Sequence, residues 1–349
     1  VEATFLNIVD FKLMPDFGNN QAVIQDAYTD LRPCAWLKVR VGKFKPPVSL
    51  ERLQSASALV FAERGYPTNL APNRDVGVQL HGDVTAGVLS YALGVFNGVV
   101  DGATLDLDNN HAKDFSARLF VQPFKGDPYS SVNGLGFGVA ASTGDRRGSA
   151  PVYAGTTLRT ASTPNLPSFR SSGQQTIFGY LVSDATPGGT VIAEGRHDRI
   201  YPQAYYYLGG LGVIAEYAWT RHRVAKIGEN KALVHQAGQV AASYVVGGKN
   251  AFEGASVDTP FDPTTGSLGA LEFGARYNFL SFDDDSFPTY ANPAASVKKA
   301  KGIAGVVNWH GNKNVKLSVT YEHAVFEGGV KDADRKAEKA LFTRVQNSF

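Results

Sequence analysis

The chain has 349 residues, of which 34 are Lys or Arg and 32 are Asp or Glu, so its formal net charge is only +2. This balance excludes a bulk positive charge that would attract nucleic acid, and the lack of an apolar run of about eighteen residues excludes a transmembrane helix. The 37 glycines, 21 phenylalanines and 15 tyrosines favour many strands joined by tight turns. Cys34 is the single cysteine, which excludes an intramolecular disulfide, and we interpret it as a structural thiol.

Alternating apolar and polar residues predict strands from the start of the chain. The first is expected over residues 3–14, the second over 21–31 and the third over 36–41. In the third strand Lys38 and Arg40 lie on the face opposite the valines. This strand therefore has one basic face and one apolar face.

An unusually long connection follows, from residue 45 to residue 72, before the next alternating strand at 76–81. Pro46 and Pro47 cannot continue a strand ladder, and residues 49–58 have helical character. Connections of this length usually have a function. We predict that segment 45–72 folds into the bore of a barrel and narrows it.

Alternation continues to the end of the chain, which brings the expected total to about fourteen strands. A second long irregular region, residues 143–195, interrupts the pattern and contains a short apolar piece at 176–182. The remaining expected strands occupy residues 87–97, 113–123, 135–139, 199–206, 211–220, 239–246, 271–279, 303–310, 315–322 and 341–349.

Strands with one apolar face, joined by short turns and long polar loops, are typical of an outer-membrane barrel. A soluble sandwich or propeller would have shorter strands and fewer basic residues on inward faces. We therefore predict an all-β, transmembrane antiparallel β-barrel that forms a single domain over residues 1–349. With Phe349 at the periplasmic end, the loops 45–72 and 143–195 would both begin on the extracellular side. The aromatic residues that fit an interfacial belt, or alternatively ordinary sheet packing, are Tyr205, Tyr206, Tyr207, Tyr217, Trp219 and Trp309.

Several short motifs resemble one family in their residues and in their order along the chain. They are residues 25–28 (QDAY), 41–45 (VGKFK), 74–82 (RDVGVQLHG), 94–98 (GVFNG), 173–175 (GQQ), 202–205 (PQAY), 212–217 (GVIAEY) and 343–349 (TRVQNSF). On these residues the chain resembles the phosphate-selective porin O and P family of Gram-negative outer membranes. The resemblance implies a sixteen-stranded homotrimer, with two strands upstream of Val1 in addition to the fourteen expected here.

The resemblance also implies a site. In this family the loop after the fifth strand folds into the pore and carries the anion site, and the matching residues are Lys43, Lys45, Arg52 and Arg64. The second long loop, with Arg159 and Arg170, resembles another inward-folding loop. The alternative is that these arginines only hold the loop in shape by pairing with Glu51 or Glu63.

Basic side chains also occupy strand faces that we expect to line the pore. They are Lys38, Arg40, Arg118, Arg199, Arg276, Lys316 and Arg344. Fixed positive charges lower the cost of bringing an anion into a narrow bore, and the planar fork of arginine suits phosphate. These residues would steer anions through the pore. Alternatively they only solvate a water-filled lumen, balanced by Asp10, Glu216, Glu272 and Glu322.

No motif predicts an enzyme, a metal site or a cofactor. Residues 106–110 (DLDNN) resemble the start of a calcium loop but lack its glycine and closing glutamate, and the histidines lack metal-ligand spacing. The favoured hypothesis is a passive trimeric porin in outer-membrane lipid for small anions, phosphate or polyphosphate among them. The alternatives are a structural or anchoring barrel with a largely plugged pore, and an outer-membrane enzyme such as a lipase, for which the sequence offers no catalytic constellation.

Overall fold

The computed structural model describes the whole chain except residues 21, 105–111, 128 and 349. One antiparallel sheet of sixteen strands dominates the fold. Its strands are β1 (Glu2–Phe5), β2 (Val9–Asp16), β3 (Val23–Cys34), β4 (Leu37–Phe44), β5 (Asp75–Val84), β6 (Leu89–Phe96), β7 (Asp114–Val121), β8 (Leu135–Arg147), β13 (Ile192–Leu208), β14 (Leu211–Lys226), β15 (Glu229–Val246), β18 (Ala270–Ser281), β19 (Val297–His310), β20 (Val315–Val330), β21 (Ala333–Asp334) and β22 (Glu338–Asn347).

The remaining elements are short and lie in the connections. They are the strands β9 (Val152–Ala154), β10 (Thr157–Thr160), β11 (Ser168–Arg170), β12 (Thr176–Gly179), β16 (Gly248–Lys249) and β17 (Ser256–Val257), and the helices α1 (Leu50–Leu53), η1 (Gly18–Asn20), η2 (Tyr66–Leu70), η3 (Thr85–Gly87) and η4 (Asp284–Ser286). No helix in the described part of the chain is long and apolar enough to cross a bilayer.

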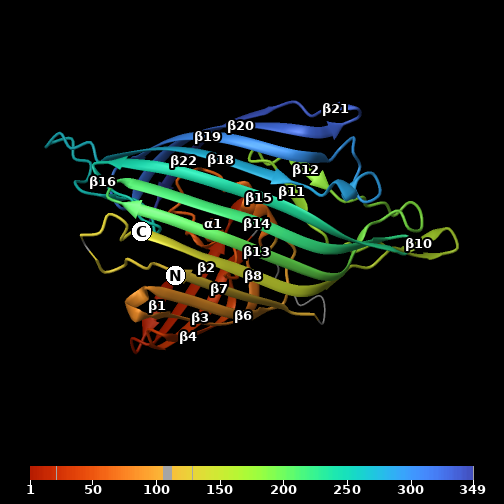
Figure 1. The fold of residues 1–349 in the computed structure, drawn as a ribbon, viewed down its shortest axis with the longest axis horizontal. Helices are drawn as coiled ribbons and strands as arrows, with labels where there is room; N and C mark the ends of the chain where they lie inside the picture. Colours follow the sequence, from red (N-terminus) through yellow and green to blue (C-terminus); the bar gives the residue numbers. More distant parts are fainter. Residues whose placement is uncertain (21, 105–111, 128, 349) are drawn as a thin grey trace.

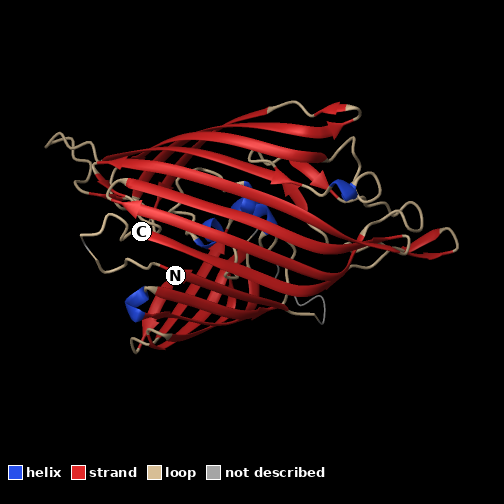
Figure 2. Ribbon diagram, viewed as in Figure 1, coloured by secondary structure: helices blue, strands red, loops and turns tan. Residues whose placement is uncertain are grey.

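The sheet follows the chain as a meander, because each long strand pairs with the next long strand in sequence. The order runs from β1 to β8, then through β13, β14, β15, β18, β19 and β20 to β22, while β21 pairs with the end of β20. The strands run obliquely around the molecule, and α1 lies inside the curved wall (Figure 1 and Figure 2). Fourteen of the sixteen strands have eight residues or more, which confirms the expected antiparallel barrel of about fourteen strands.

The prediction of a single strand over residues 3–14 is wrong. This segment forms the hairpin β1–β2, in which Phe5 pairs with Val9. Leu6 and Asn7 have positive φ angles of 51° and 57°, so the chain reverses there. The apolar residues continue through the turn, which hides it from a pattern based on alternation. The amino group of Val1 consequently lies beside β2, where it donates to the Leu13 carbonyl at 2.7 Å.

The connections divide between two ends of the barrel, because successive antiparallel strands leave from opposite ends. At the end that holds the C-terminus, here the C-terminal rim, the described residues of the connections are 6–8, 35–36, 85–88, 122–127, 129–134, 209–210, 247–269 and 311–314. At the opposite end, here the loop rim, they are 17–20, 22, 45–74, 97–104, 112–113, 148–191, 227–228, 282–296 and 331–337. The expected strands 211–220 and 239–246 are both too short, because β14 and β15 continue to a tight turn after Lys226. In Figure 1 the C-terminus and β10 mark the two ends.

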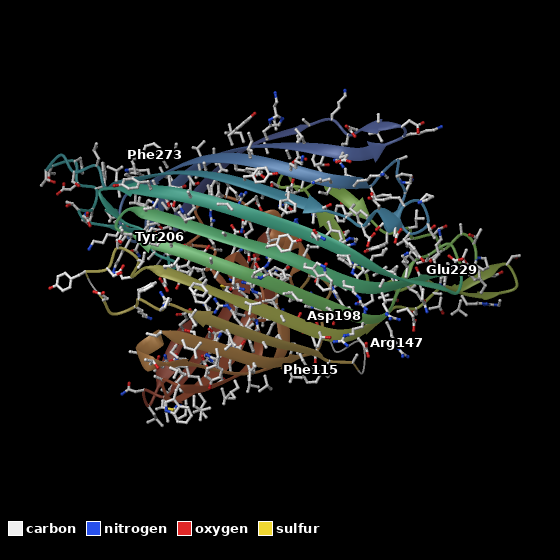
Figure 3. All side chains as sticks on the ribbon, in the orientation of Figure 1. Phe115, Arg147, Asp198, Tyr206, Glu229 and Phe273 are labelled. Carbon is white, nitrogen blue, oxygen red and sulfur yellow. The ribbon has the colours of Figure 1, made fainter. Side chains whose placement is uncertain are left out.

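The two faces of the wall invert the pattern of a water-soluble protein. On β18, Leu271 and Phe273 are exposed on the outside, whereas Glu272, Arg276 and Asn278 are buried inside. The same outer surface carries Phe115 of β7 (Figure 3). An exposed apolar band around a polar interior is stable where lipid covers the outside. The alternation seen in the sequence therefore reports lipid on one face and lumen on the other.

The aromatic run Tyr205–Tyr207 does not form one outer belt. Tyr205 stacks on Phe120 and Phe252, with ring centroids 4.8 and 5.5 Å apart, and also contacts Tyr207. Neighbouring residues of a strand point to opposite faces, so Tyr205 and Tyr207 pack inside while Tyr206 lies on the other face. The belt interpretation is thus wrong for two of these three tyrosines.

A lysine on the outer face should destabilise the barrel. Val240 is 55% exposed on β15, and we expect Val240→Lys to lower the free energy of unfolding from lipid vesicles by about 2–4 kcal/mol if it lies near the bilayer midplane. Urea unfolding, followed by tryptophan fluorescence, measures the change. Val240→Leu is the matched control and should behave like the unchanged protein. Equal stability of the lysine variant would contradict a lipid-facing position.

Candidate functional site

One segment, residues 45–74, crosses the interior of the barrel, and we call it the inner loop. It begins after Phe44, the last residue of β4, where Pro46 and Pro47 end the ladder. The single turn of α1 follows, and its first turn is capped by Ser49, whose Oγ accepts from the Arg52 amide at 3.3 Å. The short helix η2 then packs against the inner faces of β14, β15 and β18.

Apolar side chains fix the inner loop in place. Leu50 and Phe61 are 0% and 3% exposed and belong to a buried cluster with Phe120, Ile214 and Val306 of the wall. A second buried cluster includes Tyr66 and Leu70 of η2. Burial of this kind distinguishes a packed part of the core from a mobile surface loop. The inner loop is therefore a built part of the lumen.

Glu216 of β14 anchors the start of the inner loop. Its carboxylate accepts from the Leu50 amide at 2.8 Å and from the Ser49 hydroxyl at 3.0 Å. Gln239 of β15 donates to both Glu216 and Glu51 at 2.9 Å. A carboxylate that accepts backbone N–H groups at a helix start satisfies donors that the helix itself leaves free.

Two of the expected wall cations hold the inner loop by its backbone. Arg276 donates to the Glu63 carbonyl at 2.8 Å and to the Glu322 carboxylate at 2.9 Å, and Lys316 donates to the Leu59 carbonyl at 2.6 Å. Buried carbonyl groups need such partners because water is excluded from them. The positive charges of Arg276 and Lys316 are thus directed at the loop backbone.

Three further wall cations are neutralised by carboxylates. Arg199 lies 2.7 Å from Asp101 and 3.1 Å from Asp114. Lys38 pairs with Asp83 at 2.7 Å, and Arg40 pairs with Asp30 at 2.6 Å. These carboxylates are not the ones that the sequence suggested as balancing charges. Two of the suggested carboxylates have other partners, since Asp10 pairs with Arg32 and Glu272 pairs with His310. Of the four proposed balancing carboxylates, Glu322 alone pairs with one of the expected wall cations, namely Arg276.

Arg118 and Arg344 differ from the other wall cations. Arg118 donates to the side-chain oxygen of Gln203 at 2.9 Å and stacks over the Phe120 ring at 4.5 Å. Arg344 is half-buried on β22. Among the described residues, neither guanidinium lies within 4.0 Å of a carboxylate oxygen.

The inner loop brings together three of the four residues that the sequence assigned to an anion site. Lys45 and Arg64 both donate to the Gln54 carbonyl, at 2.6 and 3.0 Å, so their charges converge on one oxygen. Arg52 donates to the Thr68 carbonyl at 2.6 Å. Within the described ranges no carboxylate pairs with these three cations, which we call the loop cations.

Lys43 lies apart from the loop cations. It belongs to β4 rather than to the inner loop, and its Nζ donates to the Ile24 carbonyl of β3 at 2.5 Å. Arg159 also lies elsewhere, on the exposed strand β10 of the second long connection. Arg170, at the end of β11, contacts the inner loop, since its carbonyl accepts from the Asn69 side chain at 3.2 Å.

Burial and mutual repulsion weaken the protonation of the loop cations. Burial, and next the charge of Arg64, lowers the pKa of Lys45 to about 7. Burial, and next the charge of Arg64, lowers the pKa of Arg52 to about 10. Each cation is partly dehydrated and faces like charge, so a bound anion would stabilise all three.

A polar cavity of about 510 Å³ lies beside this cluster. Its lining comes from the inner loop, including Arg52 and Arg64, from residues 100–103 and from residues 166–174 of the second long connection. Two larger hollows, of about 780 and 820 Å³, are lined mainly by apolar residues of the outer face. Charged groups of the lumen therefore line this cavity.

The contact that holds the second long connection was not predicted from the sequence. The Tyr180 hydroxyl contacts Nε2 of His235 at 2.8 Å and also Nε2 of His222, inside the wall of β14 and β15. Tyr180 lies in the apolar piece 176–182, and the sequence assigns no role to the two histidines beyond their lack of metal-ligand spacing. Both histidines lie at inward-facing positions of their strands, and alternation could have indicated this. Alternation alone does not reveal which loop contacts them.

A metal site has no support in the described part of the chain, where no group of three or more His, Cys, Asp or Glu could hold a metal ion. The calcium-like residues 106–110 lie outside the described residues.

The fold is similar to solved outer-membrane proteins at low sequence identity. The outer membrane channel DcaP of Acinetobacter baumannii has a TM-score of 0.56 and 11% identity, with 100% of this chain and 83% of that chain covered. OprB of Pseudomonas putida has a TM-score of 0.53 and 11% identity, with 98% of this chain and 83% of that chain covered. The anion-selective porin from Comamonas acidovorans has a TM-score of 0.52 and 10% identity, with 100% of this chain and 87% of that chain covered. These likenesses concern the fold.

Comparison with curated sequences gave no significant match. The family described as phosphate-selective porin O and P matches residues 1–346, essentially the whole chain. With its lipid-facing barrel, the protein is an outer-membrane channel of the Gram-negative type. The chain belongs to the phosphate-selective porin O and P family.

Proposed function

We propose that the chain forms one barrel domain for passive diffusion of small anions, with the inner loop as its constriction and the loop cations as its selectivity element. One observation carries the proposal: Lys45, Arg52 and Arg64 project from a segment inside the bore and have no carboxylate partner among the described residues. Fixed charges at a narrow point act on every ion that passes it.

The expected electrostatic energy favours the loop cations over the wall cations as the source of selectivity. Two unit charges about 4 Å apart interact by about 4 kcal/mol at an effective dielectric constant of about 20, against about 1 kcal/mol in bulk water. Lys38, Arg40 and Arg199 are each paired with a carboxylate, which cancels most of their field at a distance. We therefore assign steering along the wall to Arg118 and Arg344 instead.

Phosphate-like ions are the anions that best fit the loop cations. The planar guanidinium groups of Arg52 and Arg64 can each donate two parallel bonds to an oxyanion, and chloride cannot use that geometry. The family name agrees with this preference, and one porin of similar fold is described as anion-selective. As in the expectation from the sequence, we propose a homotrimer embedded in outer-membrane lipid.

A second function is favoured by a different observation. The inner loop is packed and hydrogen-bonded to the wall along much of its length, which suits a largely plugged barrel with a structural or anchoring role. The two functions differ in conductance, because a plugged barrel carries no steady current.

Removing the loop cations should abolish anion preference. We expect the variant Lys45→Met, Arg52→Gln, Arg64→Gln to move the reversal potential in a KCl gradient toward zero, because the amides keep donors for the backbone carbonyls but carry no charge. Planar-bilayer recording measures the shift. Lys38→Met with Asp83→Asn, which removes a compensated pair, is the matched control and should keep the native value. An unchanged reversal potential in the triple variant would refute the assignment.

Loosening the anchor of the inner loop should widen the pore. Glu216→Ala removes the acceptor for Ser49 and Leu50, so we expect a larger and noisier single-channel conductance. Glu216→Gln keeps one acceptor oxygen and should show a smaller increase. If Glu216→Ala folds and conducts as the unchanged protein does, the inner loop does not set the width of the pore.

Anion preference should depend on pH through Lys45. Its pKa is lowered to about 7, so the positive charge is present below that pH and lost above it. We expect anion preference to fall between about pH 6 and about pH 8. Lys45→Arg, which stays charged throughout, should remove this dependence. The same pH dependence in Lys45→Arg would show that another group is responsible.

A further inference from the structure

The polar cavity is larger than a small inorganic anion requires. Its volume is about 510 Å³, whereas water occupies about 30 Å³ per molecule in the liquid. Cavities of roughly 300–1,000 Å³ are typical of sites for small organic ligands. The segments that line it all belong to connections at the loop rim, so a solute entering from that rim meets this cavity beside the loop cations.

One side of the cavity offers positive charge. Arg52 and Arg64 line it, and their hydrogen-bonding partners in the described part of the chain are neutral oxygens. The Nε atom of Arg52 is buried without a hydrogen-bond partner among the described residues. Arg170 lines the cavity too and is exposed. This side is suited to an oxyanion.

The rest of the cavity offers neutral hydrogen-bonding groups and the carboxylates of Glu63 and Asp101, of which Asp101 already pairs with Arg199. Tyr66 is only 1% exposed, yet its hydroxyl has no hydrogen-bond partner among the described residues. The carboxylate of Glu63 accepts from Gln174 at 3.1 Å and forms no ion pair within the described ranges. The remaining hydroxyl groups in the lining belong to Thr68, Ser168, Ser171 and Ser172.

These two halves match a solute that combines a charged head with a hydroxylated body. An inorganic oxyanion would use the arginines but leave the Tyr66 hydroxyl and the Glu63 carboxylate unused. A neutral sugar would use the hydroxyls but leave the arginines without a counter-charge. A solute that carries both groups can bond to the arginines and to the hydroxyl groups at once, and buried polar groups favour occupants that satisfy them.

We propose that this cavity is a binding site for a hydroxylated organic anion of the size of a hexose phosphate. Its phosphate lies against Arg52 and Arg64, and its hydroxyls bond to Tyr66 and Glu63. This inference rests on the proposed anion channel and adds a preferred solute class to it. The solute is held beside the constriction before it passes the loop cations.

The test compares three probes on the unchanged protein in a planar bilayer: glucose 6-phosphate, inorganic phosphate and glucose. Glucose 6-phosphate should interrupt the KCl current at a concentration about tenfold lower than inorganic phosphate, because it makes one or two additional hydrogen bonds. Glucose should leave the current unchanged. Equal potency of the two phosphates, in a channel that still prefers anions, would overturn the inference while the proposed function stands. If the unchanged protein shows no anion preference, the proposed function itself is overturned.

Single-atom variants locate the site. Tyr66→Phe removes only the unpartnered hydroxyl, and we expect it to weaken the block by glucose 6-phosphate about fivefold with no change in the block by inorganic phosphate or in the reversal potential. Tyr205→Phe is the matched control, since Tyr205 lies on the wall outside the cavity lining.

A second variant covers the case in which Tyr66→Phe fails to fold. Gln174→Ala changes an exposed residue of the lining that holds Glu63, and it should also weaken the block by glucose 6-phosphate alone. Unchanged block in Gln174→Ala and in folded Tyr66→Phe would show that the hydroxylated part of the solute does not bind here.

Discussion

A backbone segment placed inside a barrel must find hydrogen-bond partners on the wall, and this constraint shapes the rest of the lumen. The inner loop contributes carbonyl groups that bind Lys316 at Leu59, Asn308 at Val60 and Arg276 at Glu63. Positive side chains of the wall are therefore used to satisfy the loop backbone. What looks like a basic lining in the sequence is in part the support for the loop.

The same constraint separates the charges into two groups. Wall cations such as Arg40 and Arg199 meet carboxylates, and they stabilise the barrel without a strong field in the bore. The loop cations meet only neutral oxygens among the described residues. Because Lys45 and Arg64 share the Gln54 carbonyl, they repel each other, and a bound anion would offset this repulsion. We therefore propose that the segment that organises the lumen also sets its selectivity.

Much of the fold follows from the sequence, because lipid and lumen impose alternation on each strand. The pattern predicts about fourteen strands and the burial of the segment after Phe44. It does not predict the turn at Leu6 and Asn7, where apolar residues continue through the reversal. The pattern also does not predict which residues contact each other across the bore. Glu216 reads as a balancing charge, yet it binds the loop backbone, since alternation fixes a face but not a contact made through a loop.

The central claim is that uncompensated charge on the inner loop makes the channel prefer anions. The most direct measurement is the reversal potential of single channels of the unchanged protein across a KCl gradient at neutral pH. We expect a reversal potential of the sign that chloride permeation gives. A value of the sign that potassium permeation gives would mean that the carboxylates of the lumen dominate, and it would contradict the account.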